Sequence, residues 1–243
     1  MLAKITNKGG NTLDWFSVDS EETFNKILLT MPDDWEYRST KVSYTLNNQG
    51  YRTKEWDKIN WSESNIMIGC SNTLGLGIPE KNTMCSILEK ELEQPFINLG
   101  VVGSSNHLMF YNSMRLIEQG IRPKSVILLF SDPSRYTHFN QKEDYIIALG
   151  NWSLHDNIGY SDFYYTYSNH MNCVVHGTML AVATEALWKS IGVKTLCYSA
   201  YPNALKDKFK TLPARVDRAR EINHPGILTN KIWADTIKNE IRI

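Results

Sequence analysis

Short apolar runs alternate with longer stretches of helical periodicity from about residue 65 to the end of the chain. The apolar runs predict strands at 65–68, 95–98, 125–130 and 193–198. Helical spacing covers 82–92, 105–119 and 172–191, and after Pro225 an amphipathic stripe continues at Leu228, Ile232, Trp233, Ile237 and Ile241. Strands that alternate with helices in this way are typical of a parallel sheet covered by helices on both faces. The pattern therefore predicts an α/β fold in three layers.

The first 60 residues do not follow this alternation. They contain a predicted helix at 21–29, a predicted strand at 42–46 and a turn at 47–52. We expect residues 1–60 to form an N-terminal extension that packs on a main domain of residues 61–243.

A second departure is the segment 131–170, which is rich in aromatic and polar side chains. Its only helical signal is weak and lies at 143–149. Such an insert forms either a lid or binding wall, or a surface loop that its own aromatic side chains hold in place. The sequence leaves both alternatives open.

The charge of the chain is balanced, with 26 basic and 26 acidic side chains among 243 residues. A chain without net charge lacks the broad electrostatic attraction that nucleic-acid binders and polybasic membrane binders use, so we expect neither partner. The chain is long enough to bury a substantial core, and we expect a small-molecule substrate in a pocket. The oligomeric state does not follow from the composition.

Apolar segments and cysteines indicate the compartment. Runs such as 125–130 are much shorter than the roughly 20 apolar residues that cross a bilayer, and the N-terminus lacks the apolar region of a secretory signal. The four cysteines, at positions 70, 85, 173 and 197, form no C-x-x-C pair, which argues against a disulfide framework and a thiolate metal site. We therefore expect a reducing, cytoplasmic environment and no cofactor.

A glycine-containing turn follows the first predicted strand of the main domain. There the chain runs from apolar residues into Gly69-Cys70-Ser71. This places the Ser71 hydroxyl at the carboxyl end of a parallel strand, where open α/β sheets bind their ligands. A serine hydroxyl is a useful nucleophile near neutral pH only when a neighbouring base takes its proton. Ser71 is therefore a candidate nucleophile, provided that the fold supplies a histidine.

His224 is the candidate for that base. Glu221 precedes it by three residues, directly before the last predicted helix. On a turn this spacing can bring a carboxylate to the imidazole Nδ1, where it fixes the tautomer and stabilises the imidazolium. The loop before the last helix also lies at the carboxyl edge of such a sheet, so His224 can meet Ser71 across the cleft.

A second glycine turn follows the next predicted strand. Gly103 lies there, shortly before the predicted helix at 105–119. Its backbone N–H and that of Ser71 are candidates for holding the oxyanion of a tetrahedral intermediate, a contribution of about 3–4 kcal/mol per donor.

The order of these three motifs resembles that of the SGNH, or GDSL-type, serine esterases and lipases. Residues 68–72 look like the first block of that family, residues 98–104 resemble the second, and Glu221-x-x-His224-Pro-Gly is similar to the last. The resemblance spans about residues 65–240. It implies a flavodoxin-like α/β/α sandwich with Ser71 as the nucleophile, His224 as the base, Glu221 as the orienting acid and Gly103 as an oxyanion donor.

Two residues differ in type from the family pattern. Cys70 stands where the family has an aspartate before the nucleophile. Glu221 replaces the aspartate of the last block and is one methylene longer, so its carboxylate must fold back to reach His224. Asp217 is an alternative acid.

The third family block, Gly-x-Asn-Asp, is missing after the strand at 125–130. In the family its asparagine supplies an oxyanion donor. Asn106 and the Ser131 hydroxyl are the candidate replacements, and Ser131 and Arg135 are candidate substrate contacts.

The leading hypothesis is a serine esterase that hydrolyses a carboxylic ester through an acyl-enzyme. We expect an O-acetyl or short acyl group on a carbohydrate or similar small molecule, because the aromatic side chains of 131–170 can stack on sugar rings. The alternative is a catalytically inactive module of the same fold that binds carbohydrate or has a structural role. A third reading, a phosphate-binding loop at 69–77, lacks both the P-loop lysine and the G-x-G-x-x-G spacing.

The other histidines are interpreted as structural. His107 and His138 are near the proposed cleft. His170 and His176, which could flank one face of the predicted long helix, and the pair His155-Asp156 have no further ligands at useful spacing, so we expect no metal site.

Overall fold

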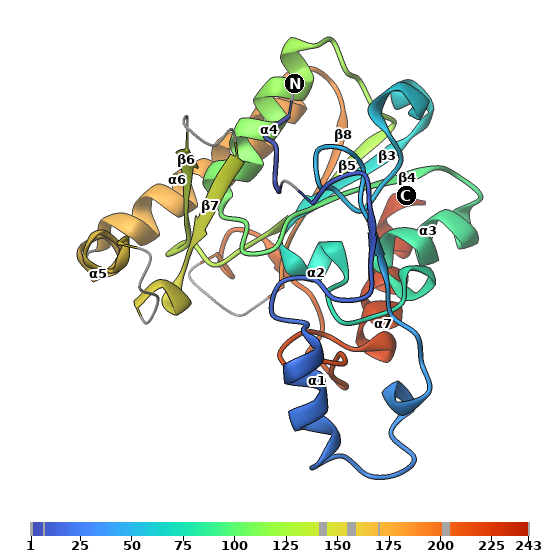
Figure 1. Ribbon diagram of the computed structural model, residues 1–243. Helices are drawn as coiled ribbons and strands as arrows, with labels where there is room; N and C mark the ends of the chain where they lie inside the picture. The colour runs from blue at the N-terminus through green and yellow to red at the C-terminus, as the bar shows by residue number, and fades with distance from the viewer. Residues whose placement is uncertain are drawn as a thin grey trace.

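The computed structural model describes residues 2–6, 8–140, 145–154, 159–169, 171–200 and 205–242. Within these ranges, a parallel sheet of five strands has the order β4-β3-β5-β8-β9 (Figure 1). The strands are β3 (Asn65–Gly69), β4 (Phe96–Gly100), β5 (Ser125–Phe130), β8 (Lys194–Ser199) and β9 (Lys210–Thr211). Renumbered along the chain, this is the flavodoxin-like order 2-1-3-4-5. The predicted α/β class with a parallel sheet is confirmed.

Helices cover both faces of the sheet. The helices α4 (Asn106–Glu118) and α6 (Met171–Ser190) pack on one face, and α3 (Met84–Leu92) and α7 (Ile227–Ile241) pack on the other (Figure 1). Ile66 and Ile68 join the buried cluster on the α4 and α6 side, whereas Met67 joins the cluster on the α3 and α7 side. A sheet buried on both faces explains why its strands are continuous apolar runs.

Capping residues set the ends of these helices. Thr83 and Ser105 are the N-caps of α3 and α4, and each side chain accepts a hydrogen bond from the backbone N–H three residues further on. Gly120 follows the end of α4 with φ of +75°, a conformation that favours glycine. Outside the insert at 131–170, the predicted strands and helices of residues 61–243 end within two residues of the observed bounds.

The insert at 131–170 is more regular than expected. Strands β6 (Tyr136–Asn140) and β7 (Tyr145–Leu149) form an antiparallel pair, followed by a 3-10 helix (Asn151–Leu154) and α5 (Ser161–Ser168). The predicted weak helix at 143–149 is therefore wrong over the strand β7. Ile146 and Ile147 are β-branched and face Phe139 and His138 across the ladder. Such cross-strand contacts favour a strand and are invisible to periodicity within one segment.

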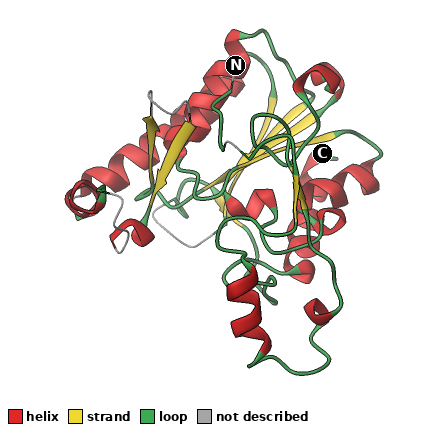
Figure 2. Ribbon diagram, viewed as in Figure 1, coloured by secondary structure: helices red, strands yellow, loops and turns green. Residues whose placement is uncertain are grey.

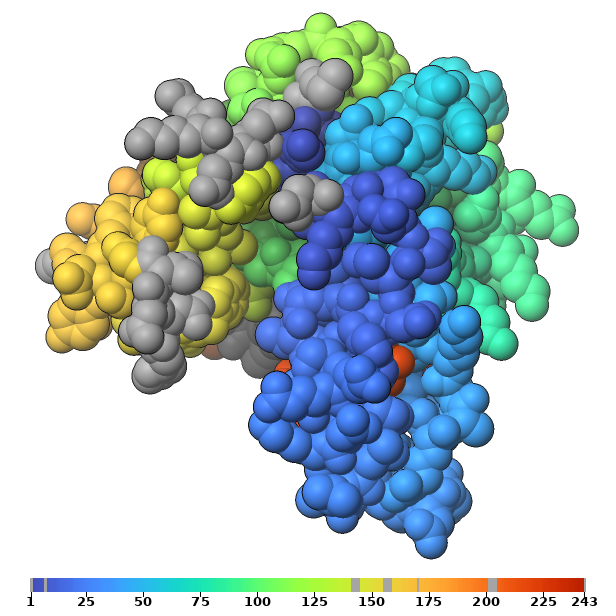
Figure 3. Space-filling view, in the orientation of Figure 1, coloured from blue at the N-terminus to red at the C-terminus, as the bar shows by residue number. Residues whose placement is uncertain are grey.

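The N-terminal segment packs against the sheet domain. Helix α1 (Glu21–Leu28) and the short strand β2 (Tyr44–Thr45) lie at the predicted positions, and β2 pairs with β1 (Thr12–Leu13). Long loops connect these elements, with 3-10 turns at Glu36–Arg38, Trp56–Lys58 and Trp61–Glu63 (Figure 2). One buried cluster contains side chains from both parts of the chain: Tyr37, Val42, Tyr44, Leu46, Leu74, Leu76, Ile78 and Ala219. In the space-filling view, the N-terminal segment covers the centre of one face of the molecule (Figure 3).

Across the described ranges, every helix is too short or too polar to pass through a lipid bilayer.

Candidate active site

Two paired glycines let the chain turn sharply at the carboxyl end of β3. Gly69 and Gly100 lie opposite each other in the β3–β4 register. A Cβ added to Gly69 would lie 2.1 Å from Oγ1 of Thr73, and one added to Gly100 would lie 2.2 Å from the backbone N of Leu74. Glycine at both positions therefore lets the one-turn helix α2 (Ser71–Leu74) sit directly against the end of the sheet. Ser71 opens this helix at the sheet edge where ligands of such folds bind.

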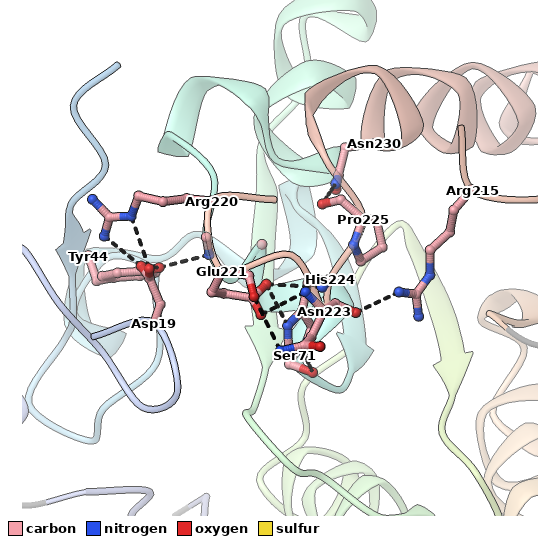
Figure 4. Close-up of polar contacts among 12 residues, drawn as sticks. Asp19, Tyr44, Ser71, Arg215, Arg220, Glu221, Asn223, His224, Pro225 and Asn230 are labelled. Carbon is pink, nitrogen blue, oxygen red and sulfur yellow. Dashed lines mark hydrogen bonds and ion pairs between the residues drawn. The ribbon is translucent and has the colours of Figure 1, made fainter. Parts of the chain in front are cut away.

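The structure brings Ser71, His224 and Glu221 into one line of hydrogen bonds (Figure 4). Oγ of Ser71 lies 2.8 Å from Nε2 of His224, and Nδ1 of His224 lies 2.9 Å from Oε1 of Glu221. The Glu221 side chain is fully buried, and that of His224 is 15% exposed. With an ionised Glu221, the imidazole proton sits on Nδ1, and the Nε2 lone pair faces the Ser71 hydroxyl.

The carboxylate of Glu221 folds back onto its own turn, as its extra methylene requires. Oε1 accepts a hydrogen bond from the backbone N–H of His224 at 3.0 Å, and Oε2 accepts one from the N–H of Asn223 at 3.0 Å. Burial raises the pKa of Glu221, but the hydrogen bond and charge of His224, together with these two amides, outweigh burial and leave the pKa below its ordinary value. Glu221 is therefore ionised at neutral pH.

The turn between Glu221 and His224 contains a strained residue. Ile222 has φ of +62°, in the left-handed region, where a residue with a Cβ pays about 1–2 kcal/mol. Two backbone hydrogen bonds close the turn: the Ala219 N–H donates to the His224 carbonyl at 2.9 Å, and the Ile222 N–H donates to the Ala219 carbonyl at 2.9 Å. Strain of this kind persists only where the surroundings fix the backbone.

Asp217, the alternative acid, has a different role. Its carboxylate accepts hydrogen bonds from the backbone N–H groups of Leu228 at 2.8 Å and Thr229 at 2.7 Å. These are amides of the first turn of α7, which have no acceptor within the helix. The interpretation of Asp217 as a possible triad acid is wrong, because Asp217 caps the helix and Glu221 holds His224.

Ser71 is the first residue of α2, so its backbone N–H has no acceptor within that helix. Gly103 lies in the turn after β4 with φ of +70°, and a Cβ there would lie 2.8 Å from Cβ of Ala148. Gly103 thus faces the edge of the hairpin that contains β7, at the same end of the sheet as Ser71.

Asn106 and Ser131 are bound to each other rather than directed at a ligand. The Asn106 amide donates to the Gly177 carbonyl at 3.0 Å and to the Ser131 carbonyl at 3.4 Å. Its Oδ1 accepts from the Ser131 N–H at 3.2 Å and from the Ser131 hydroxyl at 3.3 Å. Ser131 is fully buried. The expectations of Asn106 as an oxyanion donor and Ser131 as a substrate contact or donor are corrected: the pair ties α4 to β5 and α6.

Arg135, in contrast, lines a cavity. The cavity has a volume of about 330 Å³ and is lined by Asp132, Ser134, Arg135, Asn151 and Trp152. The Arg135 guanidinium lies 5.3 Å from the centroid of the Trp152 ring. Trp152 also contacts the position of a Cβ on Gly103, at 3.2 Å. The cavity therefore borders the Gly103 turn.

Two of the remaining histidines, His107 and His138, pack against aromatic rings of the insert. The His107 ring packs 4.8 Å from that of Tyr136, and burial is the main cause that lowers its pKa. The His138 ring packs 5.2 Å from that of Tyr160. His155, Asp156 and His170 lie outside the described residues. In the loop proposed for phosphate, the Gly77 N–H already donates to the Tyr44 hydroxyl at 2.8 Å.

Gly77 is the point where the loop after α2 touches the turn that holds Glu221. Its φ is +75°, and an added Cβ would lie 2.8 Å from Cβ of Ala219 and 3.2 Å from the backbone N of Arg220. Gly120 has the same φ of +75° but open space around the added Cβ. We expect Gly77→Ala to lower the free energy of unfolding by about 1–3 kcal/mol more than Gly120→Ala, because only Gly77→Ala adds a steric overlap. Urea denaturation of the two variants checks this; equal losses would contradict it.

No protein-family model and no curated protein matches the chain. Among solved structures, a member of the lipolytic G-D-S-L family from Veillonella parvula matches at 13% identity and a TM-score of 0.45, over 74% of this chain and 99% of that one. A family two carbohydrate esterase from Clostridium thermocellum matches at 11% identity and 0.46, over 74% and 63%. The esterase EstA from Pseudoalteromonas sp. matches at 12% identity and 0.42, over 75% and 100%. At sequence identities this low, the activities of these proteins do not transfer to this chain.

Proposed function

We propose that this protein is a serine ester hydrolase with Ser71 as its nucleophile, His224 as its general base and Glu221 as the orienting acid. The observation that carries the proposal is the unbroken line from the Ser71 hydroxyl through both ring nitrogens of His224 to the buried Glu221 carboxylate. The charge on Glu221 supports it further, because an ionised partner at Nδ1 stabilises the imidazolium that forms when Nε2 takes the serine proton.

The reaction proceeds in two halves. Oγ of Ser71 bonds to the ester carbonyl carbon while its proton passes to Nε2 of His224. The tetrahedral intermediate collapses with cleavage of the carbon–oxygen bond, and His224 returns the proton to the departing alcohol, leaving an acyl group on Ser71. Water then attacks the acyl-enzyme with His224 as base, which releases the carboxylic acid and restores the Ser71 hydroxyl.

The backbone amides of Ser71 and Gly103 stabilise the oxyanion in this scheme. Both donors are backbone N–H groups, so the turns that end β3 and β4 hold them in place. With Asn106 engaged by Ser131 and Gly177, the proposed oxyanion hole contains these two donors. Two preorganised N–H groups suffice for acyl transfer in other serine hydrolases.

The substrate class that we propose is an O-acetyl or short acyl ester of a carbohydrate. The cavity beside Gly103 combines an aromatic face, Trp152, with the polar side chains of Ser134 and Asn151 and the cation of Arg135. Sugar rings bind through apolar stacking and several directed hydrogen bonds, which this set supplies. The volume of about 330 Å³ favours a small ring over a long acyl chain.

A fluorophosphonate probe tests the mechanism directly. The probe reacts with serines that have an activated hydroxyl, and we expect a single adduct on Ser71, located by peptide mass spectrometry, and none after heat denaturation. The same protein should hydrolyse 4-nitrophenyl acetate, and should prefer an acetylated oligosaccharide to a long-chain 4-nitrophenyl ester. A folded protein that is neither labelled nor active would overturn the proposal and favour the inactive, carbohydrate-binding alternative.

A further inference from the structure

Arg220, the residue before Glu221, forms a buried ion pair with the N-terminal segment. Its Nε donates to Oδ1 of Asp19 at 2.9 Å, and its Nη2 donates to Oδ2 of Asp19 at 2.6 Å. The side chains are 6% and 0% exposed. This bidentate geometry fixes the guanidinium in both position and orientation, which a single hydrogen bond would not do.

The surroundings of Arg220 also come from the N-terminal segment. The guanidinium lies 3.9 Å from the centroid of the Trp15 ring, and Nη2 donates to the Asp14 carbonyl at 2.8 Å. Residues 14–19 thus enclose the side chain, while its backbone belongs to the turn that holds Glu221 and His224. In Figure 4, Arg220 points toward Asp19 and Tyr44, and Glu221 points the other way, toward His224.

Tyr44 completes a ring of hydrogen bonds, which we call the circuit, between the N-terminal segment and the turn that holds Glu221. Its hydroxyl donates to Oδ2 of Asp19 and accepts a hydrogen bond from the Gly77 N–H at 2.8 Å. The Gly77 carbonyl accepts in turn from the Arg220 N–H at 3.0 Å. The loop that follows the Ser71 helix and the turn that holds Glu221 are therefore joined twice: once directly, and once through Tyr44 and Asp19.

We propose that Asp19, Tyr44 and Arg220 are positioning residues, which hold the turn of Glu221 and His224 at hydrogen-bond distance from Ser71. The inference rests on the proposed function, since it assigns these residues to the same site. Ser71 is placed by the sheet itself, whereas His224 lies in a loop that contains the strained Ile222 and needs an outside restraint. A displacement of about 1 Å in such a site can cost about 10²-fold in rate.

The N-terminal segment therefore has a part in the reaction without contacting the substrate. In the space-filling view, small orange patches, which belong to the later part of the chain, are visible between the atoms of this segment (Figure 3). A substitution that breaks the circuit should loosen His224 and leave the substrate cavity intact, because the residues that line the cavity, such as Arg135 and Trp152, lie in the insert.

Tyr44→Phe tests the proposal with Tyr51→Phe as its matched control. Both tyrosines are fully buried in the same segment. The Tyr51 hydroxyl also makes two hydrogen bonds, donating to the Ala3 carbonyl at 3.0 Å and accepting from Nδ2 of Asn112 at 2.9 Å, neither of which reaches the turn. We expect Tyr44→Phe to lower kcat about tenfold or more with less than a twofold change in KM, and Tyr51→Phe to leave kcat unchanged at a similar loss of melting temperature.

The proton on Nδ1 of His224 gives a second readout that does not depend on turnover. Its hydrogen bond to Glu221 should shift its ¹H NMR resonance far downfield in the wild-type protein and in Tyr51→Phe, and the resonance should broaden or move in Tyr44→Phe. Asp19→Asn should lower kcat and change the resonance more than Tyr44→Phe does, since it leaves the buried Arg220 charge without its partner.

Equal kcat and an unchanged resonance in Tyr44→Phe and Tyr51→Phe would overturn the inference. If the wild-type protein hydrolyses no ester, the proposed function fails, and the resonance alone decides whether the circuit positions His224.

Discussion

Replacing Ser71 with alanine is expected to lower kcat on 4-nitrophenyl acetate by about 10⁴-fold or more. In the proposed mechanism Ser71 forms the covalent bond to the acyl group, so its loss removes the first chemical step rather than weakening it. The size follows from other serine hydrolases, in which removal of the nucleophile costs about 10⁶-fold and leaves only the contribution of the oxyanion hole and binding. Steady-state kinetics at saturating ester, with a stopped-flow search for an acyl-enzyme burst, measure the loss.

Ser64→Ala is the control for this variant. Ser64 is also buried, and it precedes the same strand, β3, at its opposite end, where its hydroxyl donates to the Asn60 carbonyl at 2.7 Å. It should keep wild-type kcat. The Ser71→Ala protein should fold and keep its melting temperature within a few degrees, because only one hydroxyl at the edge of the core is lost. Turnover within tenfold of wild type in Ser71→Ala would remove Ser71 from the mechanism.

The sheet could be predicted from sequence because its strands are buried on both faces. A run such as 125–130 is apolar at each position after the first, and its observed bounds, those of β5, are the predicted ones. Strand β7 gives the opposite case. Its sequence, Tyr-Ile-Ile-Ala-Leu, is a short apolar run that fits a helix or a strand, and periodicity alone does not separate the two. Its partner β6 supplies the contacts that make it a strand.

The candidate site divides in the same way. Glu221 and His224 are three residues apart, and a single turn can join them. Their contact is therefore predictable from the local sequence, and the structure shows the expected hydrogen bond. The ion pair between Asp19 and Arg220 joins residues 201 positions apart and leaves no pattern in either segment. The roles of long-range polar pairs follow from the tertiary fold, which the local sequence does not specify.

Asn106 shows why residue type alone misled. An asparagine at the start of a helix, beside the proposed cleft, is a reasonable amide donor. Its partners, however, come from the end of β5 and from α6, two elements whose approach to α4 depends on packing of the whole domain. A buried amide takes the nearest groups that satisfy it, since an unpaired buried donor costs about 1–3 kcal/mol.

Glu221→Gln is expected to lower kcat by about 10²–10⁴-fold with little change in KM. The substitution keeps the shape of the side chain but replaces one carboxylate oxygen with a donor amide. The Glu221 carboxylate accepts three hydrogen bonds: one from the Asn223 N–H, and two from the backbone N–H and Nδ1 of His224. The new amide group must face one of these donors and cannot accept from it. The imidazolium that forms in the transition state also loses its neutralising charge. The comparable aspartate-to-asparagine change in a serine protease triad lowers kcat about 10⁴-fold.

Asp217→Asn distinguishes the two carboxylates that the sequence offered as the acid. Because Asp217 caps α7, Asp217→Asn should lower the free energy of unfolding by about 0.5–2 kcal/mol and leave kcat unchanged. Glu221→Gln should instead change kcat far more than its stability loss explains, and Glu221→Asp should recover part of the rate, because the charge returns while the reach is shorter. Kinetics and urea denaturation of the three variants give this comparison. A large loss of kcat in Asp217→Asn together with normal turnover in Glu221→Gln would transfer the role of the acid to Asp217.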